Sequence, residues 1–144
     1  MRKLFVNAAR IYPQECLNLI TTCFSALSTP LSTAAFPPTE AALKLVFAFG
    51  DSGTPNLDLV KNGAFPALLT ALHESDIGNH PHVQVRLAYY DIAARYVKFV
   101  PVAGSHRAVE SLVSQYGMRC SLPLVRCRAA YFFLKIVDGM NEKA

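Results

Sequence analysis

Hydrophobic residues recur along this chain at intervals of three and four, the spacing that places side chains on one face of an α-helix. The clearest stripe lies in segment 81–100 and consists of Val85, Tyr89, Ile92 and Tyr96. We expect Pro81 in the first turn of this helix, where the missing proline N–H is not needed. No segment alternates apolar and polar residues as a half-buried strand does. The pattern therefore predicts an all-α protein.

The same pattern predicts six further helices, near residues 1–11, 14–28, 39–50, 64–75, 105–117 and 122–139. Thr39 and Ser105 are suitable N-caps, and Gly50 and Gly117 are suitable residues to end a helix. Segments 28–38 and 51–63 are rich in loop-forming residues and should connect helices.

A basic residue recurs near the start of every second helix. It occurs at spacings of 42, 42 and 40 residues, as Arg2, Lys44, Arg86 and Arg126. Such a period indicates an α-α superhelix of the HEAT or ARM type, in which an A helix and a B helix form each repeat. The B helices would lie near 1–11, 39–50, 81–100 and 122–139. The chain, 1–144, would hold three helix pairs plus one leading helix.

Composition fits a solenoid interior. Hydrophobic residues make up 52% of the chain, yet no apolar stretch approaches the ~20 residues needed to span a membrane. We expect no membrane insertion. In a solenoid each helix is covered on two sides by its neighbours, so few faces need to be polar. The apolar run 4–6 is unlike a polar capping repeat, and we therefore expect an internal piece of a longer protein.

The net charge of +4 is unevenly distributed: residues 1–79 carry −1 and residues 80–144 carry +5. The second half could meet an acidic partner or a phosphate backbone, or could simply present a solvated basic face. The candidates for phosphate contacts lie further along the B helices and are Arg95, Lys98, Arg128 and Lys135. We expect a structural role for the repeat-position residues, which in HEAT repeats bind an acid or carbonyls of the neighbouring repeat.

Catalytic chemistry has little support in the sequence. The densest polar cluster comprises His73, Glu74, Asp76, His80 and His82, and it falls in a turn between helices, where such residues serve as caps. The four cysteines form no C-x-x-C pair and no histidine stands at ligand spacing from them, so we expect no metal site. We predict neither an enzyme nor a cofactor, and no small-molecule substrate.

Three segments together resemble one known family. Segment 80–99 begins with His80-Pro81-His82 and ends in Arg95-Tyr96-Val97-Lys98-Phe99. Segment 125–137 opens with Val125-Arg126-Cys127-Arg128, and segment 42–51 ends in Gly50-Asp51. In their order along the chain these segments are similar to helices of exportin-T, the tRNA exportins of the karyopherin-β superfamily. Two departures are Asp138, where a basic residue is expected, and a shortened acidic turn after Gly50.

This resemblance implies an internal segment of a nuclear exporter that shuttles between nucleus and cytoplasm. Its partners would be tRNA and Ran in its GTP form, with nucleoporins as further candidates. Such a protein recognises the shape and phosphate backbone of tRNA. The alternative is a generic HEAT-repeat scaffold or adaptor that binds other proteins, and a gel shift at two salt concentrations would separate the two, because phosphate binding weakens steeply with salt.

Overall fold

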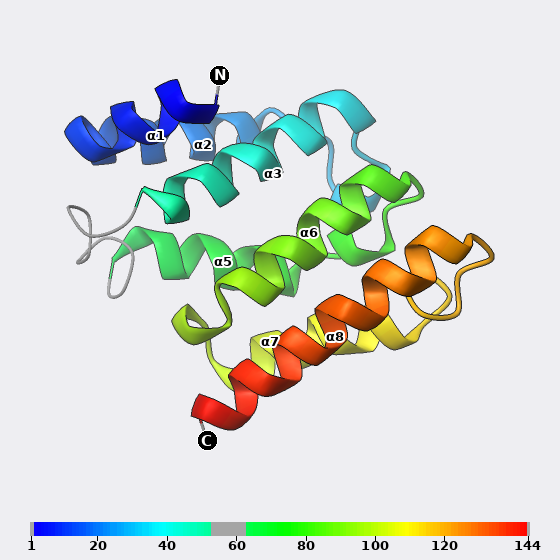
Figure 1. Ribbon diagram of the computed structural model, residues 1–144. Helices are drawn as coiled ribbons and strands as arrows, with labels where there is room; N and C mark the ends of the chain where they lie inside the picture. The colour runs from blue at the N-terminus through cyan, green and yellow to red at the C-terminus, as the bar shows by residue number, and fades with distance from the viewer. Residues whose placement is uncertain (1, 53–62, 144) are drawn as a thin grey trace.

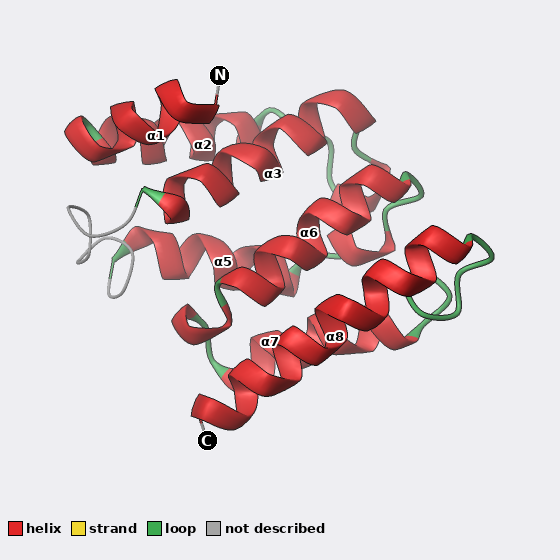
Figure 2. Ribbon diagram, in the orientation of Figure 1, coloured by secondary structure: helices red, strands yellow, loops and turns green. Residues whose placement is uncertain are grey.

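The computed structural model describes residues 2–52 and 63–143, and this part of the chain folds into seven α-helices (Figures 1 and 2). They are α1 (Arg2–Ile11), α2 (Pro13–Ser25), α3 (Phe36–Asp51), α5 (Ala64–Glu74), α6 (Val83–Arg95), α7 (Val102–Val113) and α8 (Pro123–Lys143). Three short 3₁₀ turns, η1 (Leu31–Thr33), η3 (Ile77–Asn79) and η4 (Val97–Phe99), join them. The all-α prediction is confirmed, and the described residues contain no strand.

The helices stack in two layers. In one layer α1 packs on α3, α3 on α6, and α6 on α8. In the other α2 contacts α5, and α5 contacts α7 (Figure 1). The two layers are joined within successive pairs, such as α7 with α8. This arrangement is that of an α-α superhelix, as the repeat pattern predicted.

One continuous core runs between the layers. Its largest fully buried side chains include Tyr90, Phe49, Phe65, Ile20 and Leu43. Each of these comes from a helix whose apolar positions repeat at three and four residues, so burial follows from the sequence pattern. Burying a side chain of this size stabilises the fold by about 1.5–3 kcal/mol relative to leaving it in water. None of the described helices is both long and apolar enough to cross a membrane.

The predicted cap at Thr39 is wrong. Helix α3 already begins at Phe36, with proline in its first turn. Thr39 lies inside the helix, fully buried, and its hydroxyl donates to the Ala35 carbonyl at 2.7 Å. A threonine hydroxyl can bond to the carbonyl four residues back, and this alternative replaces the capping role.

Gly50 does not end α3, which continues to Asp51. A Cβ added at Gly50 would lie 2.3 Å from the Tyr96 ring. The glycine is therefore needed for the close approach of the Tyr96 ring, which follows the end of α6, to α3. Most of the loop predicted at 51–63 lies outside the described residues.

Helix α6 is shorter than predicted at both ends. His82 is its N-cap, and its ring nitrogen Nδ1 accepts from the Gln84 N–H at 3.2 Å, so Pro81 lies before the helix and not in its first turn. After Arg95 the chain tightens into η4, which ends before Val100. Helix α8, in contrast, extends beyond the expected 139 to Lys143.

Ser105 does not cap α7. The helix begins at Val102, with Pro101 at the N-cap position, so Ser105 lies buried within it. The helix also ends earlier than predicted, at Val113. Gly117 stands in the following turn, where a Cβ would lie 2.2 Å from the Leu112 carbonyl oxygen.

Candidate nucleic-acid interface

Arg86 links the start of α6 to the turn between α7 and α8 by hydrogen bonds. Its Nη1 donates to the carbonyls of His80 and Pro81 at 2.8 and 3.0 Å, and its Nε donates to the Tyr116 carbonyl at 3.0 Å. The guanidinium also lies over the Tyr116 ring, 5.7 Å from its centroid. Only 5% of Arg86 is exposed. Arg86 is thus buried and held by three backbone carbonyls, which indicates a structural role.

Arg126 repeats part of this arrangement forty residues later. Its Nη1 donates to the carbonyls of Cys120 and Ser121 at 2.9 and 3.0 Å. These acceptors lie six and five residues before the arginine, as they do for Arg86. Unlike Arg86, Arg126 is exposed. The repeat position thus has a common local geometry on α6 and α8.

The other two repeat-position residues make ion pairs instead. Arg2 Nη2 lies 2.6 Å from Asp51 Oδ2, and its guanidinium lies over the Phe47 ring at 5.3 Å. Lys44 pairs with Glu40 one turn earlier on α3, at 2.7 Å. The four residues therefore share a register but make two kinds of contact.

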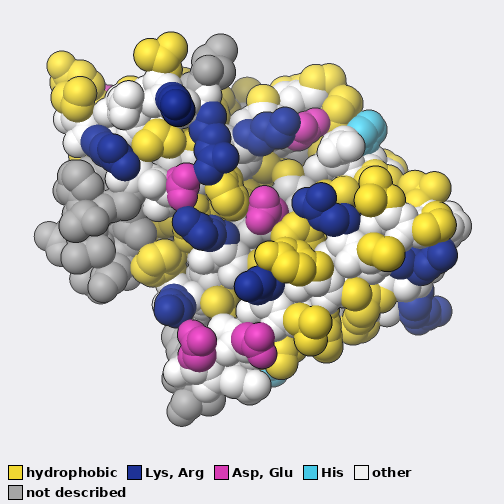
Figure 3. Space-filling view, in the orientation of Figure 1, with side chains coloured by type: hydrophobic (Ala, Val, Ile, Leu, Met, Phe, Trp, Pro, Cys, Tyr) yellow, Lys and Arg dark blue, Asp and Glu magenta, His cyan; other side chains and the backbone are white. Residues whose placement is uncertain are grey.

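A groove of about 660 Å³ crosses the face formed by α1, α3, α6 and α8. Its apolar lining includes Phe5, Phe47, Leu87 and Leu124. Its charged lining comprises Arg2, Lys44, Arg128, Glu40 and Asp91. Figure 3 shows this face, with Lys and Arg side chains interspersed with Asp and Glu. The groove therefore combines an apolar floor with charges of both signs.

Asp51, at the end of α3, bridges two helices that are distant in sequence. Its Oδ2 accepts from Arg2 on α1, and its Oδ1 accepts from Arg95 Nη2 on α6 at 3.0 Å. Burial by itself raises the pKa of Asp51, but the hydrogen bonds and charges of Arg2 and Arg95 outweigh burial and hold that pKa below its usual value. The carboxylate is thus firmly ionised at neutral pH.

Asp91 is a second carboxylate on the same face, in the lining of the groove. Burial raises its pKa above the usual value, and the nearby charges of Arg128, Arg95 and Arg2 oppose this shift. Asp91 forms no ion pair with any described residue. The charges of three arginines, from three different helices, therefore act on one half-buried carboxylate.

Helix α8 carries an exposed stripe of alternating apolar and basic residues at spacings of four, three and four, which we call the α8 stripe. Its members are Leu124, Arg128, Tyr131 and Lys135. Lys135 Nζ lies 5.6 Å from the centroid of the Tyr131 ring, and the Arg128 guanidinium lies 5.5 Å from the centroid of the Phe132 ring. Neither cation forms an ion pair within the described part of the chain. Both charges are therefore available to an anionic ligand.

The structure separates the four predicted phosphate contacts. Arg128 and Lys135 share the α8 stripe, whereas Arg95 is held by Asp51 and Lys98 lies 3.7 Å from Glu142. Arg2, which the sequence indicated only as a structural residue, lies beside the groove and shares Asp51 with Arg95. No sequence signal could have indicated this, because it depends on how α1 and α6 pack on either side of α3.

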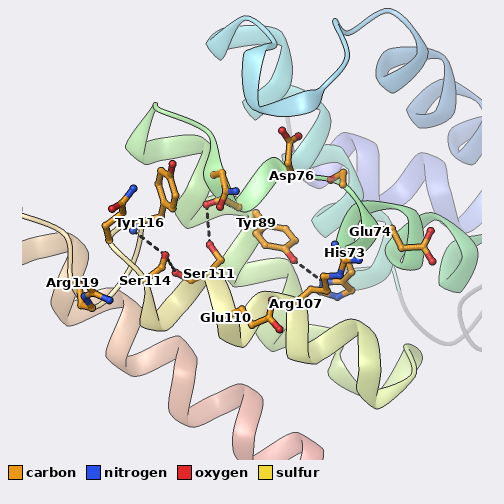
Figure 4. Close-up of a pocket in the computed structure, with 14 residues that line it drawn as sticks. His73, Glu74, Asp76, Tyr89, Arg107, Glu110, Ser111, Ser114, Tyr116 and Arg119 are labelled. Carbon is orange, nitrogen blue, oxygen red and sulfur yellow. Dashed lines mark hydrogen bonds between the residues drawn. The ribbon is translucent and has the colours of Figure 1, made fainter.

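Of the polar cluster near the α5–α6 turn, His73, Glu74 and Asp76 line a pocket of about 440 Å³, shown in Figure 4, whereas His80 and His82 do not. His73 Nδ1 lies 2.8 Å from the Tyr89 hydroxyl, and burial lowers the pKa of His73 to about 4. Asp76 accepts from Ser32, and His80 Nε2 donates to the Ala34 carbonyl at 2.7 Å. These contacts hold the turn against its neighbours. Among the described residues, no group of three metal-binding side chains comes together.

The layered helices, the repeated arginine contacts and the mixed groove define a segment of a helical-repeat protein. The chain belongs to the Exportin-T family, whose model matches residues 4–144. Similar relatives are Exportin-T of Homo sapiens, 24% identical over 151 residues, and of Danio rerio, 23% identical over 150 residues. Exportin-T of Arabidopsis thaliana is 24% identical over 147 residues. Each match covers 99% of this chain but only 15–16% of the relative's length. No solved structure matches the chain significantly.

Proposed function

We propose that this chain is part of a karyopherin that exports tRNA from the nucleus, without catalysing a reaction. The observation that carries the proposal is the family match across residues 4–144. Under this proposal tRNA is bound through its folded shape and its phosphate backbone, cooperatively with Ran in its GTP form. The protein shuttles between nucleus and cytoplasm, and nucleoporins are further partners.

The α8 stripe supports the RNA-binding part of this proposal. A-form RNA is recognised mostly through its phosphates and 2′-hydroxyls, because its narrow major groove excludes side chains. Arg128 and Lys135 are seven residues, or about two helical turns, apart on an exposed face, and both lie beside aromatic rings. Such a row of cations can follow a phosphate backbone without reading the bases.

The test is the affinity of this chain for a transcribed tRNA, measured by fluorescence anisotropy over a series of salt concentrations. Replacing Arg128 and Lys135 together by alanine should weaken binding and reduce the slope of log K against log salt by about 1.4–1.8, because each phosphate contact contributes about 0.7–0.9. The matched control replaces Arg107 and Arg119, which line the pocket on the other layer. An equal loss in both double variants would contradict a specific role for the stripe.

Ran is tested in the same assay. If tRNA and Ran bind cooperatively, Ran loaded with GTP must raise the tRNA affinity, and tRNA must raise the affinity for Ran by the same factor. Ran loaded with GDP is the control. Equal tRNA affinities in the two nucleotide states would count against the Ran-dependent part of the proposal.

A protein-binding scaffold is the second candidate, and the groove favours it. Arg2 and Lys44 at its edge are already paired with acids, and its floor is apolar. Such a surface fits a peptide helix with mixed charges better than a bare phosphate chain. This candidate predicts that tRNA binding is absent at physiological salt, which the anisotropy series measures directly.

A further inference from the structure

Three arginines from three helices lie on the face of the groove, where their charges all act on Asp91, and we call them the arginine cluster. Its members are Arg2 on α1, Arg95 on α6 and Arg128 on α8. Arg2 and Arg128 both line the groove with Asp91, and Asp51 joins Arg2 to Arg95. The three residues are far apart in sequence, so only the packing of α1, α3, α6 and α8 brings them together.

Asp51 binds the cluster in the way that an anionic ligand would. Each of its two oxygens accepts from a different guanidinium, at 2.6 and 3.0 Å. The Asp51 side chain is 25% exposed, whereas those of Arg2 and Arg95 are 65% and 58% exposed. The carboxylate therefore lies beneath two guanidinium groups whose other N–H groups reach solvent. A guanidinium carries five N–H donors in a planar fork that fits a phosphate or a carboxylate.

We propose that the arginine cluster is a site for one phosphodiester of a bound RNA, and that Asp51 is the internal anion that this phosphate displaces. This inference rests on the RNA-binding function proposed above and names a site and a regulating residue for it. The phosphate oxygens take over the Arg2 and Arg95 donors from Asp51. Arg128, which forms no ion pair with any described residue, binds the phosphate from the α8 side.

The displacement is feasible because exposed ion pairs contribute little to stability. Asp51 would lose two partners but regain water, since its carboxylate already reaches solvent. Asp91 remains in the lining of the groove, and its charge offsets part of the attraction between the arginines and the phosphate. An acidic protein segment could use the same donors, but arginines distributed over three helices suit a phosphate, whose oxygens point in several directions.

The main test is the substitution Asp51→Asn, with tRNA affinity measured by anisotropy. Removing the competing carboxylate should tighten tRNA binding roughly threefold to tenfold at low salt, the effect of one charge a few ångströms from a phosphate in water. Asp51→Glu keeps the charge and should leave the affinity close to that of the parent chain. Glu110→Gln on α7 is the charge-matched control, because it also removes one negative charge but lies at the other pocket.

The outcomes separate this inference from the proposed function. Unchanged or weaker tRNA binding by Asp51→Asn, together with the expected loss in the Arg128 and Lys135 double variant, overturns the inference and leaves RNA binding intact. Equal tightening by Glu110→Gln also overturns it, since the effect would then be net charge alone. A parent chain that does not bind tRNA even at low salt, where phosphate contacts are strongest, overturns both proposals.

Two further measurements complete the test. If Asp51→Asn does not fold, Arg2→Ala and Arg95→Ala are measured singly, and each should weaken tRNA binding more than the Arg107→Ala control. Equal effects would overturn the inference. A poly-glutamate peptide is added as a competitor, and displacement of tRNA by this peptide at lower concentration than by a short RNA duplex would show that the cluster is a carboxylate site instead.

Discussion

The contacts of Arg86 predict a large loss of stability when it is replaced. In Arg86→Ala the carbonyls of His80, Pro81 and Tyr116 all lose their donor, and the Tyr116 ring loses its cation. A hydrogen bond to a charged group contributes about 1.5–3 kcal/mol, and such contributions do not add fully within one cluster. We therefore expect Arg86→Ala to lower the free energy of unfolding by about 3–5 kcal/mol, in the range seen when a buried charged network is broken.

Arg126→Ala is the matched control within the same chain. Arg126 donates to two carbonyls at the same sequence offsets, but it is exposed, so water can replace it. Its loss should cost only about 1 kcal/mol. Arg86→Lys should lose most of the stability that Arg86→Ala loses, because an ammonium group cannot reach donors on both sides of the turn.

The assay is urea denaturation followed by circular dichroism at neutral pH. The measured quantity is the difference in unfolding free energy between each variant and the parent chain. A loss for Arg86→Ala that is within about 1 kcal/mol of the loss for Arg126→Ala would refute the reasoning, because burial would then not decide the value of this contact.

Three further predictions concern single residues. His73 has a pKa of about 4 in the folded protein and 6.5 when unperturbed. Below pH 6.5 the unfolded chain therefore binds more protons than the folded protein, and the free energy of unfolding should fall by about 3 kcal/mol between pH 6.5 and 4. Urea midpoints measured across this range test this, with the non-titrating variant His73→Asn as the comparison. Gly50→Ala should destabilise the fold by about 1–3 kcal/mol, although alanine favours a helix more than glycine does. The added Cβ would clash with the Tyr96 ring, which cannot move away easily because its hydroxyl donates to the Phe47 carbonyl. A thermal melt measures the effect, and a raised melting temperature would contradict the prediction. Ser105→Ala should be neutral or stabilising by up to about 1 kcal/mol, because the Ser105 hydroxyl has no partner among the described residues; a clear loss would show an unrecognised bond.

The sequence predicted the helices well because burial in two layers leaves a strong apolar period, as Leu43, Val46 and Phe49 on α3 illustrate. It predicted the helix ends poorly. Thr39 and Ser105 have the side chains of caps, but a hydroxyl inside a helix can bond to a carbonyl four residues back or remain buried without a partner. Glycine is typical of helix ends, but Gly50 lies inside α3, where the close approach of the Tyr96 ring requires a residue without a side chain. These outcomes depend on tertiary neighbours that a local pattern does not contain.

The candidate site was predictable only where it depends on the pattern along a single helix. The α8 stripe could be found because its members follow one helix at spacings of four, three and four. The arginine cluster could not, because the ion pairs of Arg2 and Arg95 with Asp51 each join residues more than forty positions apart. Their meeting depends on two helix–helix contacts, of α3 with α1 and of α3 with α6.

The ion pairs on this face determine how strongly tRNA binding by the chain can depend on the salt concentration. The groove, the α8 stripe and the predicted phosphate contacts together hold six cations, but Arg2, Lys44, Arg95 and Lys98 already have acidic partners. A phosphate that binds one of these paired cations must displace its carboxylate, so the exchange yields less binding free energy than a contact with an unpaired cation. Arg128 and Lys135 contribute fully, and the slope of log K against log salt should be about −1.4 to −1.8 plus a smaller share from the exchanged arginines. A slope of about −4 or steeper, the value for six independent phosphate contacts, would mean that the ion pairs do not persist in solution. With so few free cations the segment alone should bind tRNA weakly, and tight binding then requires other contacts acting on the same RNA.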